Sequence, residues 1–316
     1  MSAGSFAPPQ SALHAAGPVA DTLLGVTGVL VIGAAVIFTG VMALLWIAMR
    51  RQPAPVDRRL WLVGGGIVFP TVVLLALFAY SQWHRPPWRV APPKDALIVG
   101  VTGHMWWWEV RYRNPATGRD VIGANEIHLP VGRPVYFALA SGDVLHSFWV
   151  PSLGGKMDMV PGRLQHLQLQ ASQAGSWRGQ CAEYCGEQHG KMALHVVAQA
   201  PEAFDAWLAA QAQPAAAPTD DIAVRGRAAF VAQRCTACHT VRGLATESEE
   251  SRLGPDLTHV GSRIAIGAGT LPNGPRELAD WIANTQAHKP GARMPASPDI
   301  DAPTLEAIAG WLTQLK

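Results

Sequence analysis

An uncharged apolar run near the start of the chain constrains the fold more than any other feature. Thr22 to Met49 gives 28 residues without a charged side chain. As a helix this run is about 42 Å long, against a hydrocarbon core of roughly 30 Å, so it can span a bilayer with some tilt. A cleaved export signal is the alternative reading. Such signals begin with basic residues, and no Lys or Arg precedes Arg50, so the run predicts a transmembrane helix.

A second apolar run, Leu60 to Tyr80, follows a short basic connection. Four arginines lie in or beside that connection: Arg50, Arg51, Arg58 and Arg59. Because basic loops stay on the cytoplasmic side, both ends of this hairpin are expected to face outward, with everything after residue 82 extracytoplasmic. Pro70 is expected to kink the second helix. Residues 1–20, rich in Ala, Pro and Ser, predict a disordered lead.

The composition sets limits on function and on the redox chemistry of the chain. Its 316 residues are enough for two or three domains, and its formal net charge of +2 is too small to indicate nucleic-acid binding. There are four cysteines, in two short motifs that begin at Cys181 and Cys235. No cysteine is therefore left for a structural disulfide.

The middle of the chain has the pattern of an all-β domain. Short β-rich runs separated by Gly, Pro and Asn occur at Ala96–Thr102, Trp106–Tyr112, Pro134–Ala140, Leu164–Gln170, Ser176–Gln180 and Ala193–Gln199. Their spacing predicts a sandwich or barrel. A short amphipathic helix is expected at Pro201–Gln211, and the Pro- and Ala-rich stretch 213–220 after it predicts a domain boundary.

Four soft or nitrogen ligands lie within twelve residues, at offsets of four, four and three: Cys181, Cys185, His189 and Met192. Thiolate and thioether ligands beside imidazole select copper over calcium or magnesium. The four would share one face of a helix, or a loop between strands could wrap them around a metal. His146 supplies a second imidazole. A disulfide or a zinc knuckle is the alternative, but a knuckle would not need the methionine.

The last hundred residues contain Cys235-Thr-Ala-Cys238-His239, the spacing of covalent c-type haem attachment. Alone, this motif could also bind zinc. A helical lead-in at Ala228–Arg234 and a C-terminal helix at Ala302–Leu315 favour the haem. Met294 is the expected sixth iron ligand. His259 and His288 are the alternatives, expected instead to be surface residues.

The sequence resembles bacterial cytochrome c oxidase subunit II, the subunit that carries the copper centre CuA, with a fused cytochrome c domain. Beyond the ligand motifs, the resemblance rests on Ser147–Leu153, Val160–Arg163 and the haem-loop sequence Leu253–Leu257. It implies a multidomain membrane protein with an all-β cupredoxin domain and an all-α class I cytochrome c domain. The expected parts are a lead (1–20), a transmembrane helical hairpin (21–84), the CuA domain (85–200), a short helix and linker (201–218) and the cytochrome c domain (219–316).

The resemblance also assigns roles to individual residues. Cys181 and Cys185 would bridge two copper ions. The remaining ligands would be His146, His189, Met192 and the backbone carbonyl of Glu183, which in this family is also a candidate Mg²⁺ ligand. Haem c would be held by Cys235, Cys238, His239 and Met294. Trp106, the first of three consecutive tryptophans, would be the surface ring through which an electron enters from cytochrome c.

Two positions depart from the family pattern. Val63 stands where many members carry a glutamate at the mouth of a proton channel, which puts proton uptake through this subunit in doubt. Arg111 stands where an acidic residue commonly helps to dock a basic cytochrome c. We therefore expect electrons to enter through the c haem, with the acidic run Glu247–Glu250 as a contact for the donor.

The resemblance implies the electron-accepting subunit of a respiratory haem–copper oxidase in a bacterial inner membrane, with both termini and both redox domains on the periplasmic side. Electrons would pass from a periplasmic donor such as a cytochrome c through haem c and binuclear CuA to the haem of subunit I, where oxygen is reduced. Subunit III is a further expected partner. The alternative is a stand-alone membrane-anchored electron carrier without an oxidase.

Overall fold

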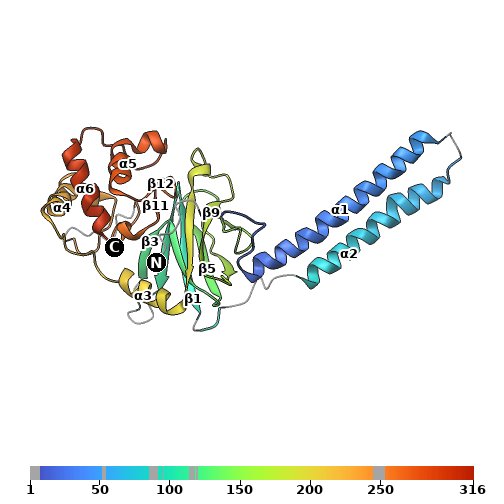
Figure 1. Ribbon diagram of the computed structural model, residues 1–316, viewed down its shortest axis with the longest axis horizontal. Helices are drawn as coiled ribbons and strands as arrows, with labels where there is room; N and C mark the ends of the chain where they lie inside the picture. The colour runs from blue at the N-terminus through green and yellow to red at the C-terminus, as the bar shows by residue number, and fades with distance from the viewer. Residues whose placement is uncertain are drawn as a thin grey trace.

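The computed structural model describes residues 8–51, 55–84, 92–94, 96–113, 118, 120–244 and 253–316. Within them the chain forms an apolar helical hairpin, a two-sheet β domain and a helical domain (Figure 1). The hairpin projects away from the two domains. These parts confirm the predicted fold class.

The hairpin covers both predicted apolar runs. It consists of α1 (Pro18–Arg50), the π-helical segment η1 (Leu60–Val68) and α2 (Phe69–Trp83). Two helices are long and apolar enough to cross a membrane, with mean hydropathies of 2.5 and 2.3. The N–H of Phe69 bonds to the carbonyl of Gly64, five residues back, just before Pro70. The helix is thus irregular beside the residue expected to kink it.

The stretch before α1 is not a disordered lead where the structure describes it. Ala16 is 4% exposed and donates its N–H to the carbonyl of Ser152 in the β domain. Gly17 packs so closely that a Cβ there would lie 2.1 Å from the carbonyl oxygen of Gln170. The prediction was wrong for residues 8–20, because the small side chains that suggested disorder are what permit this close contact.

The β domain is a sandwich of two five-stranded sheets. In order across the first sheet are β3 (Asp120–Ala124), β2 (Trp107–Arg113), β1 (Leu97–His104), β5 (Val135–Ser141) and β8 (Gln165–Leu169). Across the second are β4 (Glu126–Pro130), β10 (Ala193–Gln199), β9 (Gly175–Cys181), β6 (His146–Trp149) and β7 (Met157–Met159). The β1–β5 and β4–β10 pairs are parallel and the others antiparallel. The six sequence runs correspond to β1, β2, β5, β8, β9 and β10, whereas β3, β4 and β7 were not predicted.

The helical domain follows α3 (Pro201–Gln211), which is the predicted amphipathic helix. Its helices are α4 (Asp221–Ala232), α5 (Pro275–His288) and α6 (Ala302–Gln314), with 3₁₀ turns η3 (Cys235–Ala237) and η4 (Val260–Ser262) and a small β11 (Ala265–Ile266) and β12 (Leu271–Pro272) pair. α4 starts earlier than predicted because the Asp220 carboxylate caps it, accepting the N–H of Ala223 at 2.8 Å. The sequence analysis did not predict α5.

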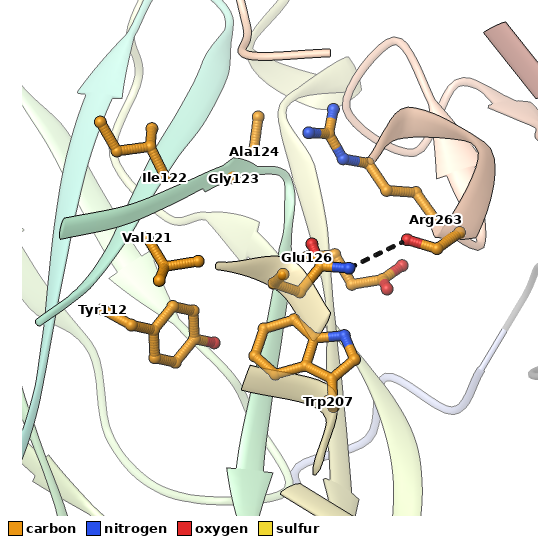
Figure 2. A pocket seen from close by; sticks show the side chains of 10 residues that line it. Tyr112, Val121, Ile122, Gly123, Ala124, Glu126, Trp207 and Arg263 are labelled. Atoms are coloured by element: carbon orange, nitrogen blue, oxygen red, sulfur yellow. Dashed lines mark hydrogen bonds between the residues drawn. The ribbon is translucent and has the colours of Figure 1, made fainter. Parts of the chain in front are cut away.

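The two domains are joined by specific contacts. The Glu126 carboxylate of β4 accepts the N–H of Ile264 in the helical domain at 2.8 Å. The N–H of Ala193 bonds to the carbonyl of Ala268 at 3.1 Å. Figure 2 shows Glu126 and Arg263 facing a small cavity between the domains, with Trp207 of α3 below them. The helical domain is therefore docked on the sandwich rather than merely tethered to it.

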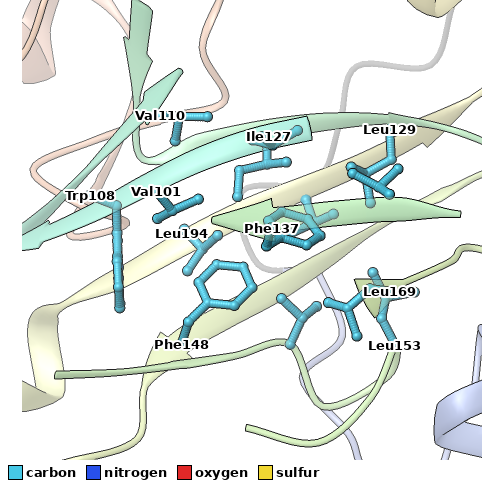
Figure 3. Packing of buried hydrophobic residues seen from close by; sticks show 14 of the residues in the cluster. Val101, Trp108, Val110, Ile127, Leu129, Phe137, Phe148, Leu153, Leu169 and Leu194 are labelled. Atoms are coloured by element: carbon cyan, nitrogen blue, oxygen red, sulfur yellow. The ribbon is translucent and has the colours of Figure 1, made fainter. Parts of the chain in front are cut away.

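The main core lies between the two sheets (Figure 3). Phe148 is fully buried there. Its ring is nearly perpendicular to that of Trp108, with centroids 5.8 Å apart, and its centroid lies 5.3 Å from that of Phe137. Because Phe148 and His146 lie two residues apart on β6, they share one side of the strand. Packing of the core thus fixes the strand that presents the first histidine of the candidate metal site.

Candidate metal and haem sites

The loop between β9 and β10 carries four of the candidate copper ligands. Cys181 ends β9, and His189 begins a short 3₁₀ turn, η2 (His189–Lys191). The N–H of Cys181 bonds to the carbonyl of Met192 at 2.9 Å, so the two ends of the loop are held together. Of the two geometries left open by the sequence, the structure has the loop.

The candidate ligand atoms converge. The two sulfur atoms of Cys181 and Cys185 are 3.7 Å apart. Nδ1 of His146 is 3.8 Å from the first sulfur, and Nδ1 of His189 is 3.6 Å from the second. Sδ of Met192 lies 3.7 Å from the Cys185 sulfur. Both cysteines, His146 and Met192 are at most 3% exposed, so the cluster is shielded from water.

Main-chain and side-chain atoms of Glu183 lie in different environments. Its carbonyl oxygen is 3.2 Å from the Cys181 sulfur, within the cluster. Its carboxylate is 3.3 Å from Nζ of Lys156, which also pairs with Asp158 at 3.2 Å. The carbonyl therefore fits a copper ligand, and the carboxylate is engaged with a cation of the same chain.

The electrostatics of the two thiols favour a bound cation. The hydrogen bond between them lowers the pKa of Cys181 to about 3, while the same contact and burial raise the pKa of Cys185. Two thiolates this close cannot both form unless positive charge lies between them. A donor set of two thiols, two imidazoles, a thioether and a carbonyl fits copper.

Asp143 orients the first histidine, a role that the sequence analysis did not assign. Its carboxylate is 2.8 Å from Nε2 of His146, which leaves Nδ1 directed at the cysteine sulfur. Burial opposes ionisation of this carboxyl. Hydrogen bonds from His146 and from the N–H groups of Met105 and Val144 outweigh burial and lower the pKa of Asp143 to about 2. The Asp-x-x-His spacing is the signal that could have revealed the pair.

Of the three consecutive tryptophans, Trp106 does not lie as predicted. Trp107 is half-buried and stacks on His104 at 4.7 Å, and Trp108 is fully buried in the core. Trp106, expected to be a surface ring, is only 9% exposed. The segment after α5 covers it: a Cβ on Gly291 would lie 3.5 Å from the ring. Its Nε1–H donates to the carbonyl of Cys185 at 2.9 Å, which links the ring directly to the copper loop.

In the helical domain, the haem-attachment motif follows α4. Nδ1 of His239 is 2.8 Å from the carbonyl oxygen of Pro255. A carbonyl only accepts, so Nδ1 carries the proton and Nε2 keeps the lone pair needed to bind iron. Burial lowers the pKa of His239, which also favours the neutral ring. The predicted haem-loop sequence therefore supplies the group that orients this histidine.

The three candidates for the sixth iron ligand have different surroundings. Met294 is half-buried and packs against the core of the helical domain, and its carbonyl accepts a hydrogen bond from Gln286 at 2.8 Å. His288 is paired with Asp280 at 2.8 Å. His259 was expected at the surface but is 4% exposed, because Nε2 contacts the carbonyl of Gln213 in the linker. These bonds use one ring nitrogen of each histidine and leave the other, so Met294 as the sixth ligand stays a prediction.

Two family descriptions match the chain. "Cytochrome C oxidase subunit II, periplasmic domain" matches residues 97–199, and "Cytochrome c" matches residues 223–316. The first segment coincides with the β sandwich and the second with the helical domain.

Curated relatives carry the same family name. "Cytochrome c oxidase subunit 2" of Alkalihalophilus pseudofirmus is 38% identical over 222 residues, which cover 70% of this chain and 62% of that protein. "Alternative cytochrome c oxidase subunit 2" of Bradyrhizobium diazoefficiens is 32% identical over 192 residues, covering 51% of this chain and 67% of that protein. The chain thus spans somewhat less than two thirds of the first relative.

A solved structure resembles part of the chain. It is the crystal structure of the periplasmic domain of subunit II of cytochrome oxidase from Bradyrhizobium japonicum. That domain is 27% identical, and the match covers 38% of this chain and 95% of that one, with a TM-score of 0.35.

Proposed function

Because the chain belongs to the cytochrome c oxidase subunit II family, we propose that it is the electron-accepting subunit of a respiratory haem–copper oxidase. The observation that carries this proposal is the convergence of six candidate copper ligands in a domain on which a Cys-x-x-Cys-His domain is docked. One chain then holds both a copper site and a haem site. Such a pairing suits relay of electrons rather than storage of metal.

The copper centre is proposed to be binuclear, with Cys181 and Cys185 as bridging thiolates. Its other ligands would be His146, His189, Met192 and the carbonyl of Glu183. When bound, copper would supply a one-electron carrier whose properties depend on the weak thioether and on outer hydrogen bonds such as that from His146 to Asp143. Binding of Mg²⁺ by Glu183 at a contact with subunit I is part of the proposal, and would require its carboxylate to leave Lys156.

The haem is proposed to be attached through Cys235 and Cys238, with His239 and Met294 as axial ligands. When bound, it would supply the carrier nearest to the donor. His239 is already oriented by the Pro255 carbonyl. Methionine as the opposite ligand favours a high reduction potential.

Electrons are proposed to enter through the haem domain rather than at Trp106. Trp106 is covered in this chain. Arg111, at a position that is commonly acidic in the family, is half-exposed and pairs with Glu109 at 2.6 Å. From residue 85 to 200 there are eleven basic and eight acidic side chains, a poor dock for a basic carrier. The acidic run Glu247–Glu250, proposed as a contact for the donor, lies outside the described residues.

The membrane arrangement completes the proposal. The two apolar helices would anchor the chain in a bacterial inner membrane, with both redox domains and both termini on the periplasmic side. Subunit I would receive the electrons and reduce oxygen, and subunit III would be a further partner. The stand-alone carrier is the competing reading, and purification through an affinity tag decides between them. Subunit I with its own haem and copper supports the oxidase, whereas a chain isolated without it contradicts that reading.

Deleting residues 219–316 tests the proposed electron path. The deletion uncovers Trp106, yet we expect oxidation of a basic external cytochrome c at low ionic strength to fall by about tenfold or more, because an encounter by diffusion replaces the tethered one. Copper content of the shortened chain is the control for folding. Turnover close to that of the full chain, with copper retained, would show that the copper domain accepts electrons directly.

A further inference from the structure

Lys289 is a buried cation at the centre of the domain interface. It directly follows α5 in the helical domain and is only 3% exposed. Its Nζ donates to the carbonyl oxygens of Trp106 at 2.6 Å, Lys191 at 2.8 Å and Gly267 at 3.0 Å. An ammonium group has three N–H donors, so its hydrogen-bonding capacity is fully used.

The three acceptors belong to three separate segments. Trp106 precedes β2 in the sandwich, and Lys191 lies in the copper loop directly before Met192. Gly267 lies between β11 and β12 of the helical domain. One side chain therefore connects the tryptophan, the copper loop and the haem domain at a single point.

The segment that follows Lys289 reaches from the copper domain to the candidate haem ligand. Gly291 lies against the ring of Trp106, and Met294 is three residues further on. Gln286 braces this segment: its amide N–H groups donate to the carbonyls of Ala292 and Met294, both at 2.8 Å. A displacement of Lys289 would therefore move both Gly291, which contacts the ring of Trp106, and Met294.

Burying an ammonium group on neutral carbonyls alone is costly. Burial lowers the pKa of Lys289 to about 7, in part offset by the nearby Cys185 sulfur. A methionine of similar length would fill the same space without this desolvation cost. A lysine at this position is explained if its three directed bonds set the position of the segment that follows it.

We propose that Lys289 is a positioning residue that holds the segment 289–294 against Trp106 and thereby sets the rate of electron transfer from the haem domain to the copper domain. The part of this inference that concerns the electron-transfer rate rests on the proposed function. The docking contact itself depends only on residues of this chain. Trp106, through its bond to the Cys185 carbonyl, is then the internal connection between the two domains.

The test is the variant Lys289→Met in the full chain, within its membrane complex. The haem is first photoreduced. The rate at which one electron then passes from the haem to the oxidised copper is followed by absorbance. We expect that rate to fall by about tenfold or more, because small displacements between reacting groups have large kinetic effects. Hydrogen exchange of the amides in residues 104–108 and 265–270 is the second readout, and it should speed up as the domains separate.

Lys191→Met is the matched control. Lys191 is exposed at the same interface, and its Nζ makes one bond, to the carbonyl of His288 at 2.5 Å. The variant removes a lysine amino group from the same interface but keeps the main-chain carbonyl to which Lys289 donates. We expect its rate and hydrogen exchange to stay within about twofold of the wild type, because a single exposed bond contributes little.

Two results would overturn the inference. One is a Lys289→Met variant with unchanged transfer rate and unchanged hydrogen exchange. The other is a Lys191→Met variant that is impaired to the same degree, which would indicate a general effect of charge. Failure of the proposed function gives a different result: wild-type chain lacking copper or haem. The hydrogen-exchange comparison then still tests the docking role of Lys289.

Discussion

At the residue scale, two candidate ligand histidines are oriented in the same way: an oxygen acceptor holds one ring nitrogen by a hydrogen bond. Asp143 holds Nε2 of His146, and the Pro255 carbonyl holds Nδ1 of His239. In each ring the other nitrogen is left with its lone pair for the metal. Different nitrogens are used because one partner is a side chain three residues away and the other is a carbonyl on a separate loop.

Replacing Cys181 with Ser is expected to abolish copper binding and leave the haem intact. A hydroxyl oxygen is a hard, weakly acidic ligand that does not bridge copper as a thiolate does. Metal analysis and the haem absorbance of the purified variant check this. Two coppers per chain in the variant would contradict the assignment, and Met192→Leu, which removes only a weak ligand, should retain them.

Replacing Met294 with Ala is expected to remove the low-spin spectrum of the haem and to lower its reduction potential, since methionine ligation favours a high one. Visible spectroscopy and a redox titration measure both changes. His288→Ala is the control, because it removes one of the alternative ligands and leaves Met294 in place. A wild-type spectrum for Met294→Ala would instead favour one of the histidines.

At the element scale, the fold of the haem domain depends on a close crossing of α4 and α6. A Cβ on Gly226 would lie 1.9 Å from the carbonyl oxygen of Ala307 and 2.9 Å from Cβ of Trp311. Trp311 in turn packs edge-on against Phe230 at 5.2 Å. The helices can therefore approach this closely only with glycine at the crossing.

The variant Gly226→Ala is expected to destabilise the haem domain by about 1–3 kcal/mol, because the added methyl must push the two helices apart. Denaturant unfolding followed by haem absorbance measures the change. Gly123→Ala in β3 is the matched control, since a Cβ there has no neighbour within 4 Å. Equal stability of Gly226→Ala and wild type would show that the crossing can widen at no cost.

At the scale of the whole molecule, a buried carboxylate connects the two domains. Glu126 accepts a hydrogen bond from Nε2 of His128 at 2.9 Å and another from the N–H of Ile264 at 2.8 Å. Burial raises its pKa, but these bonds and the charge of Arg263 outweigh burial, and the pKa lies below the ordinary value of 4.5. Docking of the haem domain is thus coupled to ionisation of one side chain.

A carboxyl whose pKa is lower in the folded state stabilises that state above its unfolded pKa and loses the effect as pH falls through the folded value. We therefore expect the melting temperature of the full chain to decrease as pH falls below about 4.5. The variant Glu126→Gln should show a smaller decrease over the same range. Identical pH profiles for the two proteins, measured by calorimetry, would contradict this role.

Features that depend on residues close together in the chain could be predicted from the sequence alone. The apolar runs, the helix at Pro201–Gln211 and six of the strands follow from local periodicity. The soft ligands of the copper loop lie within twelve residues, and the haem motif within five, so their chemistry is readable without a fold. The structure brings together the predicted copper ligands, whose roles remain a proposal.

Features that depend on residues far apart in the chain could be seen only in the folded protein. Ala16 packs on a domain that begins some eighty residues later, and Trp106 is covered by a segment near Gly291. Lys289 and its acceptor Trp106 are 183 residues apart. Periodicity and motif spacing describe neighbours along the chain, whereas burial of these residues is set by which surfaces meet when the domains dock. A lysine in the printed sequence is therefore expected at the surface, and only the closed interface shows it buried on three carbonyls.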